Sequence, residues 1–227
     1  MSDPTTFRSI LLPTAVIPPA GTFVTGVYDV LGFTAGYSIT DNVMATAGGV
    51  LPLPNRWFGA SGYDASWSAA WSLGAKAGFH LLKDLIIGGG YQFGQSYYDQ
   101  DVSEKLESKI TFNAIWANAG WGTDDSRLNV YVGYAFKYHE TAYVGSYSAD
   151  ATIVGAAYDY RIGYNWKLCS EVVFMRTMTF VPITLTARYF DPVQAFEFGF
   201  TVTGIPASGA AASAWPIIPM LSWVRRW

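Results

Sequence analysis

Few side chains in this sequence are of a type that performs covalent chemistry or binds a metal. The sequence has two histidines, His80 and His139, and one cysteine, Cys169. Both histidines fall on strand faces that otherwise carry small residues, so we interpret them as lining an interior or its rim. Cys169 has no second cysteine with which to form a disulfide, and neither metal-ligand spacing nor a GxSxG motif occurs. We therefore predict no enzyme activity, no cofactor and no metal site.

Charged residues on the same small-residue faces are more informative. An inward charge in a β-barrel either neutralises a neighbour or helps to screen the solutes that pass. Asp29 joins this set if a β-bulge near Gly32 shifts the phase of its strand. The main candidates for charges that line or constrict a lumen are Lys76, Lys137, Asp159, Arg161, Glu171, Arg188 and Glu197.

Two opposite-charge pairs follow from counting strand positions across short turns. One turn places Arg161 opposite Glu171, and the next places Arg188 opposite Glu197. Both pairs are expected to point inward. They are interpreted either as neutralised structural pairs or as a charged constriction.

The strands that would position these charges have an inverted pattern. In one strand Leu128, Val130 and Val132 alternate with Asn129 and other small or polar residues, and most strands repeat this alternation. A soluble barrel would place the large residues inside and cover its outside with Lys and Glu. An apolar outside with a small, polar inside is what a lipid bilayer requires. The predicted fold class is therefore all-β, a transmembrane antiparallel up-and-down β-barrel.

The composition agrees with a membrane barrel. The 227 residues are 51% hydrophobic and 17% aromatic, but only 14% are charged, whereas soluble domains average about 25% charged residues. No uninterrupted apolar run is long enough for a transmembrane helix. A net charge of −3 excludes the basic footprint of a nucleic-acid-binding protein. The chain opens without a secretory signal, so we expect a signal already removed or replaced and a location in the bacterial outer membrane.

The whole chain, 1–227, is expected to form one β-barrel domain of about twelve strands. Residues 22–227 supply the barrel strands, and 1–21 forms either an irregular first strand at Phe7–Pro18 or a segment within the lumen. The second possibility reduces the count to about ten. Stretch 22–40 is taken as one bulged strand, with a tight hairpin as its alternative. Short connections are expected at 40–42, 83–84, 122–126, 165–167 and 191–194, and longer ones at 54–66, 99–108 and 140–150.

Aromatic residues gather near the predicted strand ends. This placement is typical of the two interfacial girdles of a membrane barrel. In the last strand, Trp223 and Trp227 share one face, and Trp227 ends the chain. Aromatic-ended strands resemble the recognition signal read by the barrel-insertion machinery, and that role is implied by the resemblance alone.

Several short motifs resemble a known group. They are Leu12-Pro13-Thr14-Ala15, then Gly21, then Gly36-Tyr37-Ser38-Ile39-Thr40-Asp41-Asn42, then Ala47-Gly48-Gly49, and later Tyr160-Arg161-Ile162-Gly163 within 155–171. The order is similar to that of poorly characterised, porin-like outer-membrane β-barrel proteins of Bacteroidetes-type bacteria. The resemblance touches about half of the chain and implies a barrel in the outer membrane, without implying a substrate.

The favoured function is a passive, porin-like channel for small solutes. The alternative is a structural or anchoring barrel, with a blocked lumen, in an envelope or surface assembly. A membrane-embedded enzyme ranks last. The expected partners are membrane lipid or lipopolysaccharide and either other envelope proteins or further copies of the chain, with no nucleic acid.

Overall fold

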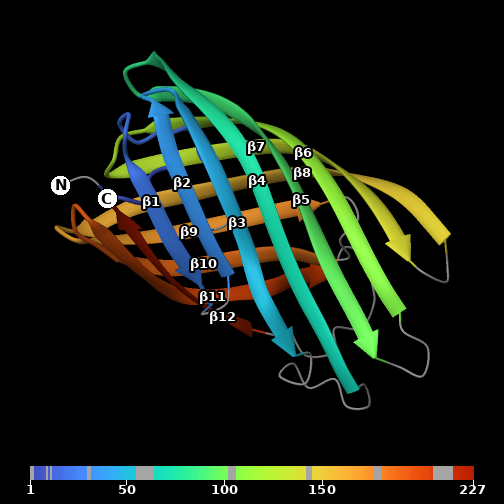
Figure 1. The fold of residues 1–227 in the computed structure, drawn as a ribbon. Coiled ribbons are helices and arrows are strands. Elements are labelled where there is room, and N and C mark those ends of the chain that lie inside the picture. Colours follow the sequence, from blue (N-terminus) through green and yellow to red (C-terminus); the bar gives the residue numbers. More distant parts are fainter. Residues whose placement is uncertain are drawn as a thin grey trace.

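The computed structural model describes residues 3–8, 10, 12–29, 32–54, 64–101, 106–141, 145–175, 180–206 and 217–227. These residues form a closed barrel in which each strand pairs antiparallel with its sequence neighbour, and β12 pairs with β1 (Figure 1). Among them no helix is long and apolar enough to cross a membrane. The strands are β1 (Phe23–Tyr28), β2 (Gly32–Thr40), β3 (Val43–Pro54), β4 (Asp64–Leu82), β5 (Leu85–Asp101), β6 (Leu106–Gly122), β7 (Ser126–Thr141), β8 (Gly145–Gly163), β9 (Trp166–Met175), β10 (Phe180–Phe190), β11 (Gln194–Pro206) and β12 (Ile217–Arg226).

The predicted fold class is therefore confirmed, and the five short connections expected at 40–42, 83–84, 122–126, 165–167 and 191–194 all lie at one end of the barrel. The same end holds the closing contact, where the Trp227 N–H donates to the Phe23 carbonyl at 2.8 Å and the Phe23 N–H donates to the Trp227 carbonyl at 3.3 Å. We call this the turn end and the opposite one the loop end. Because β1, β2 and β12 have 6, 9 and 10 residues while β4 and β8 have 19 each, the wall is low on one side, as Figure 1 shows.

The strand count of twelve is correct, but its composition differs from the prediction. Phe7–Pro18 is not a strand of the wall. The missing strand comes from stretch 22–40, which is the hairpin β1–β2 rather than one bulged strand. Asp29 directly follows β1 and has a φ of 48°, a left-handed conformation that Asp tolerates in turns. Strands this short are stable here because each pairs with neighbours on both sides.

The outward face is apolar, as predicted. Val132, Phe198 and Leu185 expose 51%, 50% and 45% of their surface, although they lie in the middle of well-paired strands. Such exposure would be costly in water and is favourable in lipid. The other predicted members of this outer band are also exposed or half-buried: Leu128, Val130, Val154, Ala156, Ile183, Phe196 and Phe200.

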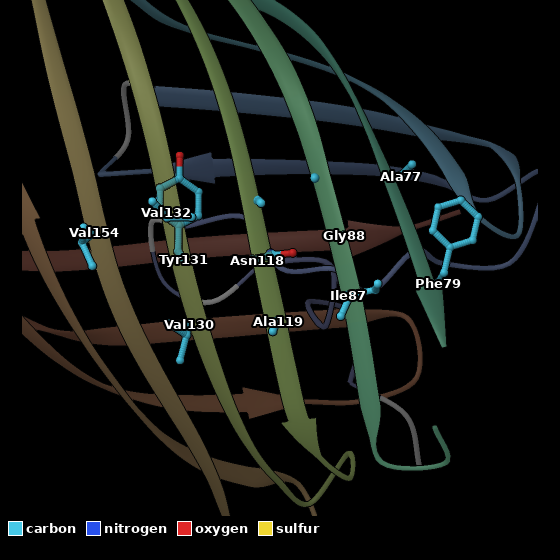
Figure 2. A pocket seen from close by; sticks show the side chains of 12 residues that line it. Ala77, Phe79, Ile87, Gly88, Asn118, Ala119, Val130, Tyr131, Val132 and Val154 are labelled. Atoms are coloured by element: carbon cyan, nitrogen blue, oxygen red, sulfur yellow. The ribbon is translucent and has the colours of Figure 1, made fainter. Parts of the chain in front are cut away.

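A shallow apolar hollow of about 750 Å³ interrupts this outer band on β4–β8 (Figure 2). Its outward-facing residues include the small Ala77, Gly89, Ala117 and Ala119. Larger side chains, such as Phe79, flank them. Because the hollow faces lipid, it belongs to the membrane surface of the barrel and not to its lumen.

Aromatic residues form a girdle at the turn end. Trp227 exposes 61% of its surface, and the Arg225 guanidinium lies 3.9 Å from the centre of its ring. Trp223 shares the outward face with Trp227 and packs against Phe196. The shared outward face expected for Trp223 and Trp227 is confirmed, whereas their place at the periplasmic interface and the role of Trp227 as an insertion signal stay predictions.

An arginine in the middle of the outer band should destabilise the barrel. Val132→Arg is expected to lower the free energy of unfolding in lipid vesicles by about 2–4 kcal/mol, because it places a charge in the hydrocarbon. The control is Ile162→Arg, at an exposed position near the turn end, where the expected loss is about 0–1 kcal/mol. Urea unfolding of the protein in vesicles measures both. Equal losses in the two variants would contradict the membrane depth assigned to Val132.

Candidate functional site: a plugged lumen

The lumen of the barrel is occupied by the chain's own N-terminal segment. Within residues 3–18, here called the plug, Asp3, Phe7 and Ile10 expose only 1%, 6% and 2% of their surface. The plug enters near the turn end, reaches inward, and returns to the turn end at Gly21. Gly21 has a φ of 80°, which suits glycine at the sharp bend that leads into β1. The barrel is therefore not an open pore in this structure.

The plug is irregular because its sequence supplies turns rather than a strand. The Asp3 carboxylate accepts hydrogen bonds from the backbone N–H of Thr5 at 2.9 Å and from its hydroxyl at 2.5 Å. Further along, the Thr14 N–H donates to the Phe7 carbonyl at 3.2 Å, which folds the segment back on itself. The prolines of the plug lack the N–H groups that a wall strand would need.

One group of buried charges anchors the start of the plug. Asp3 lies 3.1 Å from the Lys167 ammonium and 3.2 Å from the Arg188 guanidinium, and all three side chains are almost completely buried. Arg188 also contacts Glu197 at 3.1 Å. The Glu197 carboxylate also forms an ion pair with the Arg8 guanidinium of the plug, at 3.3 Å. The plug thus inserts one acid and one base into a charged network of β9, β10 and β11.

A second group of contacts holds the middle of the plug through its backbone. Glu171 accepts hydrogen bonds from the N–H groups of Ile10 and Leu12 at 3.0 and 3.1 Å. On the opposite wall, the Lys76 ammonium donates to three plug carbonyls at 2.6–3.0 Å, those of Phe7, Thr14 and Val16. These contacts satisfy backbone groups that have no sheet partner inside the lumen.

Glycines in the wall make room for the plug. A Cβ atom at Gly78 would lie 1.7 Å from the Ala15 carbonyl oxygen, and one at Gly155 would lie 2.4 Å from Leu12. The side chain of Phe7 fits beside Val24 and Met44 in a small apolar cluster. The small-residue face of the strands therefore matches the shape of the plug.

The two predicted charge pairs had different outcomes. Arg188 lies opposite Glu197, and their side chains form a buried ion pair, so this prediction is confirmed. The pairing of Arg161 with Glu171 is wrong, because Ala157 lies opposite Glu171 and Arg161 lies opposite Lys167.

The error came from the length of the turn. Tyr164 and Asn165 form it, so Trp166 and Lys167 belong to β9, and this moves the register by three residues. An irregularity between Arg161 and Gly163 moves it by one more. Arg161 instead contacts Asp125 of a neighbouring turn at 2.5 Å. Its position is the rim of the turn end.

The remaining candidates are also placed by the structure. Lys76 and Asp159 are buried and face inward, as predicted. The side chains of Lys137 and His139 lie outside the described residues. Asp29 does not face the lumen as proposed. Its carboxylate accepts the Leu221 N–H at 2.8 Å at the exposed end of the β1–β2 hairpin.

Three residues of the charged network were missed. Lys167 was assigned to a turn, although it follows the inward parity of Cys169 and Glu171 in β9. Asp3 and Arg8 precede the first strand, where alternation gives no signal. Their opposite charges, in a segment that also contains Pro4 and Pro13, are the hint in the sequence that the segment belongs inside.

A cavity of about 160 Å³ remains on the loop side of the plug. Plug and wall both contribute to it, and its lining includes two cationic and four aromatic residues. It is lined by Phe7, Arg8, Pro13, Tyr28, Thr34, Thr46, Lys76, Gln92 and Trp116, with Ala75 and Tyr91. Gln92 of β5 pairs with Gly74 of β4, and Gly74 lies two residues nearer the loop end than Lys76. The cavity therefore lies between the plug and the loop end.

The described residues that could bind a metal or act as a nucleophile do not lie together. Within the described part of the chain, no cluster of three His, Cys, Asp or Glu residues could hold a metal ion. Cys169 is a free, buried thiol. His80 is exposed near the turn end. The buried charges of the lumen therefore make up the candidate site.

Burial alone would raise the pKa of the Asp3 carboxyl. The positive charges of Arg188 and Lys167, together with the hydrogen bonds from Thr5, outweigh that effect and hold the pKa of Asp3 well below its usual range. Asp3 is therefore charged at neutral pH and anchors the plug as an anion.

Solved structures with a similar fold are outer-membrane barrels. The translocator domain of the autotransporter NalP from Neisseria meningitidis is 11% identical, with 90% of this chain and 85% of that one covered and a TM-score of 0.50. The Pseudomonas putida toluene transporter TodX is 9% identical, with 97% and 72% covered and a TM-score of 0.47. Outer-membrane expressed OmpT of Vibrio cholerae is 10% identical, with 93% and 100% covered and a TM-score of 0.41.

At these identities the likeness concerns the fold. No protein-family model matches the chain, and no curated protein matches it. The resemblance to Bacteroidetes-type proteins stays a prediction. What the comparisons support is a β-barrel of the outer-membrane type.

Removing the central cation of the network should destabilise the barrel strongly. Arg188→Met leaves Asp3 and Glu197 buried beside fewer positive charges, and we expect a loss of about 3–5 kcal/mol in the free energy of unfolding. Arg161→Met is the control. Its partner Asp125 exposes 70% of its side chain, so the expected loss is about 0–1 kcal/mol. Similar losses in the two variants would contradict a dry, plugged lumen.

The contribution of Asp3 should depend on pH in one direction. Because its pKa is depressed on folding, its stabilising effect is complete above the unfolded value of about 3.9 and is lost as the pH falls through the folded value. The difference in unfolding free energy between wild type and Asp3→Asn should therefore stay constant from about pH 7 to 5 and shrink only below about pH 4. A difference that already declines between these two higher values would contradict the anchoring role of the Asp3 carboxylate.

Proposed function

We propose that the chain is an outer-membrane channel for small solutes that its own N-terminal plug closes at rest. The observation that carries the proposal is that the lumen is filled by a separate segment rather than by wall side chains. That segment continues into the wall at one place, Gly21, so it can move without breaking a pair of wall strands. The cavity between the plug and the loop end offers a binding site for a solute while the channel is closed.

The outer-membrane location is part of the proposal. The apolar outer band and the aromatic girdle support a barrel in a bilayer, and the similar solved barrels are outer-membrane proteins. With the turn end facing the periplasm, as is usual for short turns, the plug would close the periplasmic half of the lumen.

A structural or anchoring barrel is the second candidate, and the buried charge network favours it. Each charge that the plug leaves unpaired would cost several kcal/mol, so a plug held by Asp3, Arg8, Lys76 and Glu171 resists removal. In that case the plug is a permanent part of the interior, and the outer wall or the loops carry the function.

A reversible lock on the plug separates the two candidates. In a Cys169→Ala background, Ala15→Cys with Gly88→Cys places the two sulfurs side by side. A Cβ at Gly88 would lie 2.9 Å from the Cβ of Ala15 and 2.6 Å from the Ala77 carbonyl oxygen, so the disulfide forms after a shift of about 1 Å that brings the two Cβ atoms to about 3.8 Å. Single-channel recording in planar bilayers is expected to show openings under reducing conditions and none after oxidation. Ala15→Cys alone is the matched control and should not respond to oxidation.

The outcome that contradicts a channel is equally clear. If the wild type, the reduced double-cysteine protein and a variant lacking residues 3–18 all fail to conduct while remaining folded, the barrel is structural. Openings that persist after complete oxidation would instead show that solutes pass without movement of the plug.

A further inference from the structure

We propose that the cavity above the plug binds a small carboxylate with a short apolar body. The inference deepens the proposed channel function, because it names the class of solute that this lumen admits. Its basis is the combination of positive charge, hydrogen-bond donors and aromatic rings that the described lining residues bring together.

The charge around the cavity is positive. Lys76 and Arg8 both line it, and no Asp or Glu is among its described lining residues. Arg8 has an acidic neighbour in Glu197, which lines a smaller cavity on another side of Arg8. The hydrogen bonds of Lys76 in the described structure go to neutral carbonyl oxygens of the plug. A charge without a counter-ion in a low-dielectric lumen attracts an anion.

Three donors in the lining can hold the oxygens of that anion. They are the Tyr28 hydroxyl, the Thr46 hydroxyl and the Trp116 indole N–H. In the part of the chain that the structure describes, none of the three makes a hydrogen bond to another residue. The three residues are only partly buried, so their donors are accessible from the cavity, and a carboxylate offers two oxygens with several acceptor positions.

The size and the walls of the cavity limit the rest of the ligand. A volume of about 160 Å³ equals roughly five water molecules at about 30 Å³ each, which is room for one aromatic ring or a short aliphatic chain. Phe7, Tyr28 and Trp116 supply apolar ring surface around it. The two cations disfavour an amine.

Three ligands of nearly equal shape test the charge requirement. Isothermal titration of the purified full-length barrel in detergent at neutral pH should show saturable binding of benzoate. Benzamide should bind at least tenfold more weakly, and benzylamine should show no binding. Equal binding of benzoate and benzamide, or tighter binding of benzylamine, would overturn the proposal.

Two variants locate the binding inside the cavity without touching the anchors of the plug. Trp116→Phe removes the indole N–H and keeps a ring, while Thr46→Val removes the hydroxyl at nearly constant volume. Each should weaken benzoate binding about threefold to tenfold at an unchanged melting temperature. Trp121→Phe and Thr152→Val, on the exposed outer face, are the matched controls and should leave binding unchanged. Binding that ignores both cavity variants would place the benzoate elsewhere and contradict the site.

The test also separates this site from the channel. Benzoate binding requires no conduction and can be measured on the oxidised, plug-locked protein. Binding together with bilayers that stay silent for the wild type and for the reduced double-cysteine protein supports the site and contradicts the proposed channel. Conduction without preference for carboxylates contradicts the site and leaves the channel in place.

Discussion

Closure of the sheet is the constraint on which the rest of this structure depends. In a bilayer every strand must pair on both sides, because an exposed edge would leave backbone N–H and C=O groups without water. The pairing of β12 with β1 supplies the last of these contacts, even though β1 has only six residues. Once the sheet is closed, the alternation of side chains creates two environments, lipid outside and a confined lumen inside. An apolar side chain is favourable in the first, and a charge is tolerated only when it is paired in the second.

The confined lumen makes the buried charges depend on one another. Arg188 is fully buried and contacts acids from both the plug and the wall. Asp3 and Arg8 of the plug have opposite charges, so the plug adds no net charge to the network it joins. A neutral insertion of this kind avoids the desolvation penalty of a lone ion. It also explains how a short, irregular segment without sheet pairing can be positioned specifically.

Alternation along the sequence was sufficient to predict the barrel, its outward face and the Arg188–Glu197 pair. The barrel and its outward face follow from the alternation of side chains with a period of two, and the Arg188–Glu197 pair follows from one well-defined turn. Both signals lie within a few consecutive residues of the sequence. The Arg161–Glu171 pair failed because the exact turn residues decide register, and a Tyr-Asn turn is not distinguishable from its neighbours by composition. The hairpin β1–β2 was not predicted, because its strands are shorter than membrane strands usually are.

The plug shows a deeper limit of the same reasoning. An inward face of Gly, Ala, Ser and Thr satisfies an open, watery pore and a filled one equally well, because small residues leave space and do not specify its occupant. Gly78 and Gly155 are needed here because Ala15 and Leu12 lie against them, a contact between segments distant in the sequence. Whether the lumen is open therefore depends on the anchors of the plug, not on the wall. Any solute or partner that opens it must compete with Lys76, Glu171 and Arg188 for the groups they now hold.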